Sequence, residues 1–247
     1  LYAAFLVIVL IFAGIWLANH SVSASVNTKT GAASARSPIQ AGGLLERVLV
    51  VPSSAAAAAQ GKAALAASVQ HEFKDGSFSV EVASSAKSSL SRYGTVQPVP
   101  QMRIPQPKEE KVSGKPGGGR TCTPTSQRPW SIVKVNGGTG GSGINVAILD
   151  TGAVKHPDLK LVVCMDTTKS RITGGCDDQN GHGTHVAGIV AANGGKDGKG
   201  IYGVAPDANL WSIKVCRADG SCMLDDIVEG IYYAVDRGAN IISMSIG

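Results

Sequence analysis

The sequence of 247 residues lacks several patterns that mark common functional classes. None of its five cysteines forms a C-x-x-C pair, so zinc binding by cysteine is less favoured than disulfide formation. Residues 121–247 also lack a basic surplus, because 11 Lys and Arg stand against 12 Asp and Glu, a net charge of −1. Residues 1–120 contain 12 against 6, a net charge of +6. Residues 121–247 therefore show no basic stripe of the kind that binds nucleic acid, and we expect no nucleic-acid partner.

The second half contains four of the cysteines, in two closely spaced pairs. Cys164 and Cys176 bracket one loop, and Cys216 and Cys222 bracket another. Each pair could close a short disulfide in an oxidising compartment, although spacing alone leaves the connectivity open. Cys122 is left over, which is typical of a free thiol or of a partner outside this sequence.

The sequence begins with a long uncharged apolar run, Leu1 to Ala18. This run is long enough to span a membrane, and the small residues Val22-Ser23-Ala24 after it resemble a signal-peptide cleavage site. We interpret residues 1–24 as a secretory signal in preference to a retained membrane anchor. In both cases we expect the rest of the protein to be exported, with membrane contact only through this segment.

Residues 45–106 predict a small α+β domain. The expected elements are a strand at 47–52, a helix at 53–67, a hairpin at 68–82 around an Asp-Gly turn, a helix at 84–94 and an extended piece at 95–104. This β-α-β-β-α-β order is the split βαβ, or ferredoxin-like, pattern. The flanking residues 25–44 and 107–127 are rich in small residues or glycine and predict linkers.

Residues 128–247 predict a different architecture. Apolar runs of the kind found in buried parallel strands occur at 144–150, 161–166, 209–216 and 240–246, and helical patterns occur at 185–193 and 224–238. Alternating strands and helices predict an α/β fold, a mostly parallel sheet with helices on both faces. A G-x-G-x-x-G match at 138–143 precedes the first strand, whereas a dinucleotide fingerprint must follow a strand, so we discount it.

One aspartate and two histidines are candidates for chemistry. Asp150 ends an apolar strand, where the active groups of parallel sheets gather. His182 begins a helix, so one nitrogen of its ring could form a hydrogen bond with Asp150, which would orient the ring. The other nitrogen would then face a nucleophile. A zinc site using both His182 and His185 is less favoured, because helical zinc pairs have i, i+4 spacing with a glutamate between the histidines. A purely structural role for both histidines is the other alternative.

Five motifs give a family resemblance. VAILDTG, HPDL, HGTHVAGIVAA, GVAP and SMSIG occur in the order and spacing of the subtilisin-like serine proteases, and the similarity covers residues 128–247. The resemblance implies that Asp150 is the orienting acid of an Asp-His-Ser triad, that His182 is its general base and that His185 is a structural neighbour. It also implies that residues 45–106 are a propeptide, which assists folding and inhibits the protease until cleavage within 107–127.

Further roles follow from the same resemblance. The segment CRADGSC is similar to the edge that pairs with an extended peptide substrate, with Ser221 as the contact. Ser245, Ile246 and Gly247 resemble the opposite substrate-binding strand. Asp158 matches a calcium ligand, and the loop 193–200, with Asp197, could supply further oxygens for Ca²⁺. We expect no organic cofactor.

The family's nucleophile motif, G-T-S-x-A, does not occur in these 247 residues. We therefore expect the sequence to be an internal part of a longer reading frame, and expect this part alone to be inactive. For the whole protein we expect a secreted precursor of a serine endopeptidase that acts on peptides and proteins. The alternative is a non-catalytic, membrane-anchored binding protein that keeps the protease fold.

Overall fold

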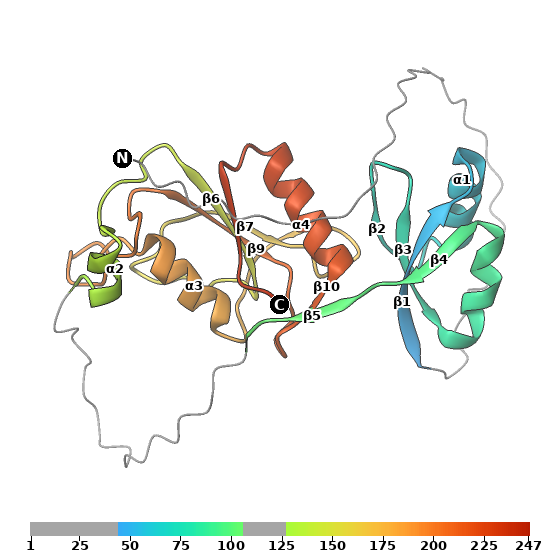
Figure 1. Ribbon diagram of the computed structural model, residues 1–247, viewed down its shortest axis with the longest axis horizontal. Coiled ribbons are helices and arrows are strands. Elements are labelled where there is room, and N and C mark those ends of the chain that lie inside the picture. Colours follow the sequence, from blue (N-terminus) through green and yellow to red (C-terminus); the bar gives the residue numbers. More distant parts are fainter. Residues whose placement is uncertain (1–43, 106–126) are drawn as a thin grey trace, which may run out of the picture. The chain divides into compact units, whose positions relative to one another are not determined.

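The N-terminal part of the described chain is built on a four-stranded antiparallel sheet. The computed structural model describes residues 44–105 and 127–247 (Figure 1). The first elements are β1 (Leu45–Pro52), α1 (Ala55–Ala64), β2 (Val69–Glu72), β3 (Phe78–Ala83), η1 (Ser84–Arg92) and β4 (Gly94–Pro98). The strand order is β2-β3-β1-β4, with every neighbouring pair antiparallel. This order confirms the split βαβ pattern predicted from the sequence.

The second helix of this domain differs from the prediction. Residues 84–92 form the 3₁₀ helix η1, and Gly94 begins β4 instead of ending a helix. The segment is rich in serine, and serine hydroxyls compete for backbone groups, as the Ser89 hydroxyl does by donating to the carbonyl of Ala86. The buried Leu90 still anchors η1 in a core with Val48, Val50 and Phe78.

A parallel sheet forms the centre of the second part. Its strands are β6 (Asn145–Asp150), β7 (Leu161–Asp166), β8 (Thr173–Gly174), β9 (Asn209–Lys214) and β11 (Ile241–Met244), in the order β11-β6-β9-β7-β8. All neighbouring pairs are parallel except β7 with β8. The remaining elements are α2 (Trp130–Lys134), α3 (His182–Ala191), β10 (Ser221–Met223) and α4 (Leu224–Asp236). The α/β prediction is confirmed, and α3 begins at His182, where a helix start was expected.

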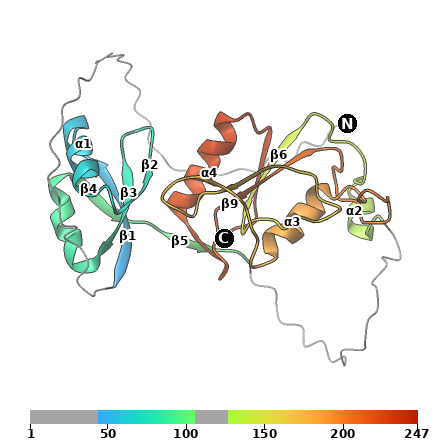
Figure 2. The same cartoon turned by 180° about the vertical axis from the view of Figure 1, so that it is seen from behind.

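Helices cover both faces of this sheet because apolar residues occupy both sides of its central strands. Ala147 and Leu149 of β6 pack in a cluster that includes Ile227 of α4. The alternate residue Ile148 packs in another cluster with Ala187 of α3. Figures 1 and 2 show α3 and α4 beside the sheet in views from opposite sides. Helices α3 and α4 therefore pack on opposite faces of the sheet.

The short strand β5 (Gln101–Arg103) leaves the first sheet and pairs with the second part. It runs antiparallel to β10, with Arg103 opposite Ser221 and Gln101 opposite Met223. The described residues of both parts belong to one compact unit. The predicted extended piece at 95–104 therefore consists of two strands with different partners.

Two disulfides are present, Cys164–Cys176 and Cys216–Cys222, as the paired spacing suggested. The expected signal or anchor at 1–24, most of both linkers and Cys122 lie outside the described residues. Within the ranges 44–105 and 127–247, no helix is both long and apolar enough to cross a membrane.

Candidate active site

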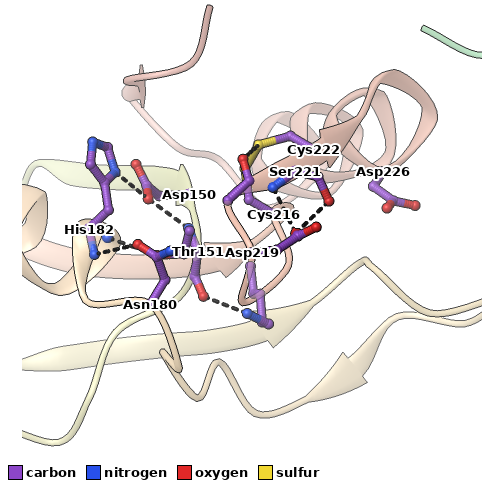
Figure 3. Close-up of a disulfide and its surroundings, with 12 residues drawn as sticks. Asp150, Thr151, Asn180, His182, Cys216, Asp219, Ser221, Cys222 and Asp226 are labelled. Carbon is purple, nitrogen blue, oxygen red and sulfur yellow. Dashed lines mark hydrogen bonds and ion pairs between the residues drawn. A yellow bond between two sulfur atoms is a disulfide. The ribbon is translucent and has the colours of Figure 1, made fainter. Parts of the chain in front are cut away.

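Asp150 and His182 meet at the carboxyl edge of the parallel sheet. The Nδ1–H of His182 donates to the Oδ1 of Asp150 over 2.8 Å, as Figure 3 shows. The Asp150 side chain is 1% exposed, whereas that of His182 is 18% exposed. Asp150 Oδ1 also accepts a hydrogen bond of 2.7 Å from the backbone N–H of Thr151. The buried carboxylate thus fixes one ring nitrogen, and Nε2 has no hydrogen-bond partner within the described chain.

Glycine makes the close approach of α3 to β6 possible. A Cβ atom on Gly183 would collide with the carbonyl oxygen of Gly152 and lie 3.1 Å from the Cβ of Asp150. The backbone N–H of Gly183 instead donates to the hydroxyl of Thr151 over 2.9 Å. The first turn of α3 therefore rests directly on the residues that follow β6, which brings His182 within hydrogen-bond distance of Asp150.

Asp178 holds the start of α3 and was not singled out from the sequence. Its carboxylate accepts hydrogen bonds from the backbone N–H groups of Asn180, Gly181 and Thr184 and from the hydroxyls of Thr184 and Thr151. Burial by itself would raise the pKa of Asp178, but the hydrogen bonds led by Thr184 outweigh it and lower the pKa below its ordinary value. The sequence feature that could have identified Asp178 is its position four residues before a helix that starts with histidine, where an acidic side chain favours the helix N-terminus.

Lys214 is a second buried group that the sequence analysis passed over. It stands opposite Asp150 in the β6–β9 register, and its Nζ donates to the carbonyl of Thr151 over 2.6 Å. Burial lowers the pKa of Lys214, while the carboxylates around it, led by Asp166, oppose that shift. A lysine inside an apolar strand was the available signal. Its positive charge offsets part of the negative charge gathered at this edge.

The expected substrate edges flank a strand of this same chain. Arg103 exchanges two backbone hydrogen bonds of 2.9 Å with Gly247, and the N–H of Ile104 donates to the carbonyl of Gly220 over 3.0 Å. Together with the β5–β10 pairing, these bonds place an extended segment between the two predicted edges. The Ser221 hydroxyl donates to the carboxylate of Asp219, and this bond lowers the pKa of Asp219. The backbone of Ser221 is engaged as well, because its N–H donates to Asp219 Oδ1 over 3.0 Å and its carbonyl accepts from the N–H of Arg217 over 2.8 Å.

Of the other predicted substrate residues, Ile246 packs against the core beside α4, and Ser245 forms no side-chain hydrogen bond within the described residues. His185 is exposed and lines a cavity of about 370 Å³ with His156, on a different surface from the Asp150–His182 pair. No described group links His185 to Asp150, which agrees with its expected role as a structural neighbour.

The loop 193–200 folds around Asp158. A Cβ atom on Gly195 would lie 2.8 Å from Asp158 Oδ1 and 3.7 Å from Asp197 Oδ1, so both predicted metal residues border the same small space. The side-chain amide of Gln127 donates to the carbonyl oxygens of Gly198 and Gly200. Carboxylate, carbonyl and amide oxygens are the donors that Ca²⁺ prefers, so the residues present fit this ion. Gln127 was not predicted, because it lies far from the loop in sequence.

These features describe an α/β protein that holds a carboxylate–imidazole pair of the kind used for nucleophilic catalysis. Residues 141–247 match the model of the subtilase family, Peptidase_S8. The chain is 41% identical to "Subtilisin" of Bacillus sp. (strain TA39) over 62% of its own length and 39% of that protein. It is 45% identical to "Intracellular serine protease" of Paenibacillus polymyxa over 44% of its own length and 34% of that protein.

Among solved structures, "Sphericase" is 48% identical, with coverage of 46% of this chain and 40% of that chain and a TM-score of 0.44. The chain thus spans about two fifths of the length of the relatives it matches. Residues 141–247 are thus similar to the subtilase family of serine proteases, the family that the motifs indicated.

Two glycines of α3 provide a matched test of the close approach to β6. Gly183→Ala should lower the free energy of unfolding by about 1–3 kcal/mol, because its Cβ must push α3 away from β6. Gly188→Ala meets no atom within 4 Å and should instead stabilise the helix by about 0.5–1 kcal/mol. Urea unfolding of both variants checks the expectation, and equal effects of the two substitutions would refute the packing argument.

The lowered pKa of Asp178 predicts a pH-dependent stability. Above its ordinary value of 3.8 the ionised carboxylate stabilises the fold fully, and this contribution is lost as the pH falls through the lowered pKa. Asp178→Asn should therefore cost about 1.5–3 kcal/mol at pH 7, with the difference from wild type shrinking below pH 4. The exposed neighbour Asp177 provides the control, and Asp177→Asn should have little effect in urea unfolding at either pH. A deficit for Asp178→Asn that stays constant down to pH 2 would contradict this account.

Proposed function

We propose that the protein containing this chain is a serine endopeptidase that cleaves peptide bonds by acyl transfer to water. His182 Nε2 takes the proton of a serine hydroxyl as that hydroxyl attacks the substrate carbonyl, and then returns the proton to the leaving amine. Asp150 orients the ring and stabilises the imidazolium that forms. The observation that supports this role is the 2.8 Å contact between a buried Asp150 and a ring whose Nε2 is free.

The proposed substrate is an extended polypeptide. Strand β5 supports this proposal, because its backbone pairs with β10 on one side and with Gly247 on the other. A substrate bound in the same way would be held mainly by main-chain hydrogen bonds, which depend little on sequence. Selectivity would then come from pockets for its side chains.

Residues 45–106 are proposed to be the inhibitory propeptide of this enzyme. Because β5 occupies the space between the two substrate edges, a peptide cannot pair there until this segment leaves. The similarity to the Bacillus "Subtilisin" covers 62% of the chain, which is more than residues 141–247 provide. The cleavage that frees the enzyme is proposed to fall within 107–127.

Secretion, with a signal peptide at residues 1–24, is the proposed location. The two disulfides support an oxidising compartment. Retention by the N-terminal apolar segment is the second possibility. One relative is described as intracellular, so similarity alone does not decide the location.

A structural Ca²⁺ ion is proposed at Asp158. The Asp158 carboxylate and the carbonyl oxygens of Gly198 and Gly200 would hold it, with Asp197 at the border of the site. The Gln127 NH₂ group donates to both carbonyls, so its amide would have to rotate before its oxygen could join the ion. The role of the ion would be to fix the loop 193–200, which follows α3 and is joined to Asp158 by the N–H of Asn193, which donates to the Asp158 carbonyl over 2.9 Å. No step of catalysis is assigned to the ion.

Substitution in the mature full-length protein tests the catalytic proposal. His182→Ala should lower kcat by about 10⁶-fold, and Asp150→Asn should lower it by about 10⁴-fold. These magnitudes are those of the corresponding substitutions in subtilisin and, for the acid, in trypsin-like enzymes. The control is His185→Ala, on the exposed side of the same helix, which should retain activity within a few fold. Peptide hydrolysis and labelling by a fluorophosphonate provide the two readouts.

The same experiment separates the enzyme from a non-catalytic binding protein of this fold. An enzyme reacts with the fluorophosphonate at one serine and loses the reaction in His182→Ala. A mature full-length protein that binds peptides but neither hydrolyses them nor takes the label would contradict the proposed function.

Calcium binding is checked by thermal unfolding. At a Ca²⁺ concentration 100-fold above Kd, the ion should stabilise the fold by about 2.7 kcal/mol, and a chelator should remove this gain. Asp158→Asn should abolish most of the response, whereas the exposed Asp207→Asn should preserve it. Identical unfolding curves with Ca²⁺ and with chelator would exclude the site.

A further inference from the structure

Four ionisable residues form a buried cluster between the N-terminal domain and α4. Arg47 of β1 places its Nη1 2.7 Å from Asp226 Oδ1 and 3.3 Å from Asp225 Oδ1. His71 of β2 donates from Nε2 to the same Asp226 oxygen over 2.8 Å. The exposed fraction of each of these four side chains is 4% or less.

The cluster contributes selectivity more than net affinity. Burial raises the pKa of Asp226 despite the opposing effects of His71 and Arg47, so holding this carboxylate ionised costs free energy. In addition, Arg47 Nε and the Oδ2 atoms of Asp225 and Asp226 lack hydrogen-bond partners among the described residues. When such a cluster loses one member, the remaining charge is buried without compensation, and the complex is strongly penalised.

A metal ion is a weaker explanation of the same residues. The ligand atoms of His71, Asp225 and Asp226 lie within 4.8 Å of one another, a spacing that a metal could use. However, Arg47 Nη1 already contacts both carboxylates. A metal ion would have to displace this guanidinium, so Arg47 is the cation of the cluster.

The cluster is separate from the groups proposed for catalysis and from the substrate edges. In Figure 3, Asp226 lies apart from Asp150 and His182. The β5 segment is held through its backbone, which most sequences could provide. Besides the contacts of Phe73 and Lys74 with α4, two kinds of contact therefore join the domain to the protease part. One is a main-chain contact that depends little on sequence, and the other is a buried charge contact that requires particular residues on both sides.

We propose that Arg47 and His71 on one side, and Asp225 and Asp226 on the other, form a recognition site that makes the N-terminal domain selective for a protease part with paired acids at the start of α4. This inference rests on the proposed role of residues 45–106 as an inhibitory domain. The partner that fits the acidic pair is a domain of the split βαβ fold that presents an arginine and a histidine from two strands of its sheet, as β1 and β2 do here. A protease part that lacks these acids leaves the arginine buried and unpaired, and is rejected.

The test measures binding in the full-length protein with His182→Ala, so that no self-cleavage occurs. A recognition sequence for a site-specific protease is inserted within 106–126 and cut. The cut protein is diluted in steps, and gel filtration measures the fraction of the N-terminal piece that stays bound at each concentration. The dependence of this fraction on concentration gives the Kd. Because no catalysis is involved, this test can succeed even if the proposed peptidase activity fails, and an active peptidase can fail this test.

Arg47→Met and Asp226→Asn, which lie on opposite sides of the contact, should each raise Kd by about 30-fold or more. The double variant should raise Kd by much less than the product of the two single effects, because the second change removes a charge that the first left unpaired. Lys74→Met is the control: its ion pair with Asp236 joins the same two parts but is solvent-exposed, so Kd should change by less than about threefold.

Circular dichroism of each piece checks folding, and Asp226→Asn keeps the test valid if Arg47→Met unfolds the N-terminal piece. Single effects no larger than that of Lys74→Met would overturn the proposal. So would single effects that multiply in the double variant, or a wild-type N-terminal piece that dissociates as soon as the linker is cut.

Discussion

The hydrogen bond between His182 and Asp150 depends on how closely a helix can approach the end of a strand. Without a side chain at position 183, the first turn of α3 contacts the backbone that follows β6, and the imidazole reaches a carboxylate that is otherwise enclosed. Asp178 fixes the same turn through five hydrogen bonds, and Lys214 offsets the charge of the buried acids. The buried carboxylate of Asp150 is stabilised by the hydrogen bonds that its Oδ1 accepts from His182 Nδ1 and from the backbone N–H of Thr151.

Two of the contacts between the N-terminal domain and the protease part differ in their physics. Pairing of β5 with β10 and with Gly247 uses main-chain groups, and the same groups are those that we propose to hold a substrate. The contact of Arg47 with Asp226 uses desolvated charges on elements that do not participate in the proposed chemistry. The backbone of such a domain blocks the substrate edges, and its buried charges decide which protease part it binds. Selectivity for one protease part therefore requires no change in the catalytic groups.

The sequence predicted the parts of this structure that depend on local pattern. Apolar runs located β6, β7, β9 and β11, and the motifs around Asp150 and His182 indicated that these two side chains meet. It could not predict contacts that tertiary packing decides. The pairing of β5 with β10 joins segments over a hundred residues apart, and Arg47 and Asp226 are separated by 179 positions. The 3₁₀ form of η1 was missed because serine side chains competed with α-helical hydrogen bonding.

The state of the His182 ring tests the central claim most directly. Nitrogen-15 NMR of the full-length protein labelled at histidine reports which ring nitrogen bears the proton. The account predicts that neutral His182 is protonated at Nδ1, with Nε2 bare, and that this preference is lost in Asp150→Asn. A neutral ring protonated at Nε2, or a spectrum that Asp150→Asn leaves unchanged, would contradict the arrangement from which the proposed function follows.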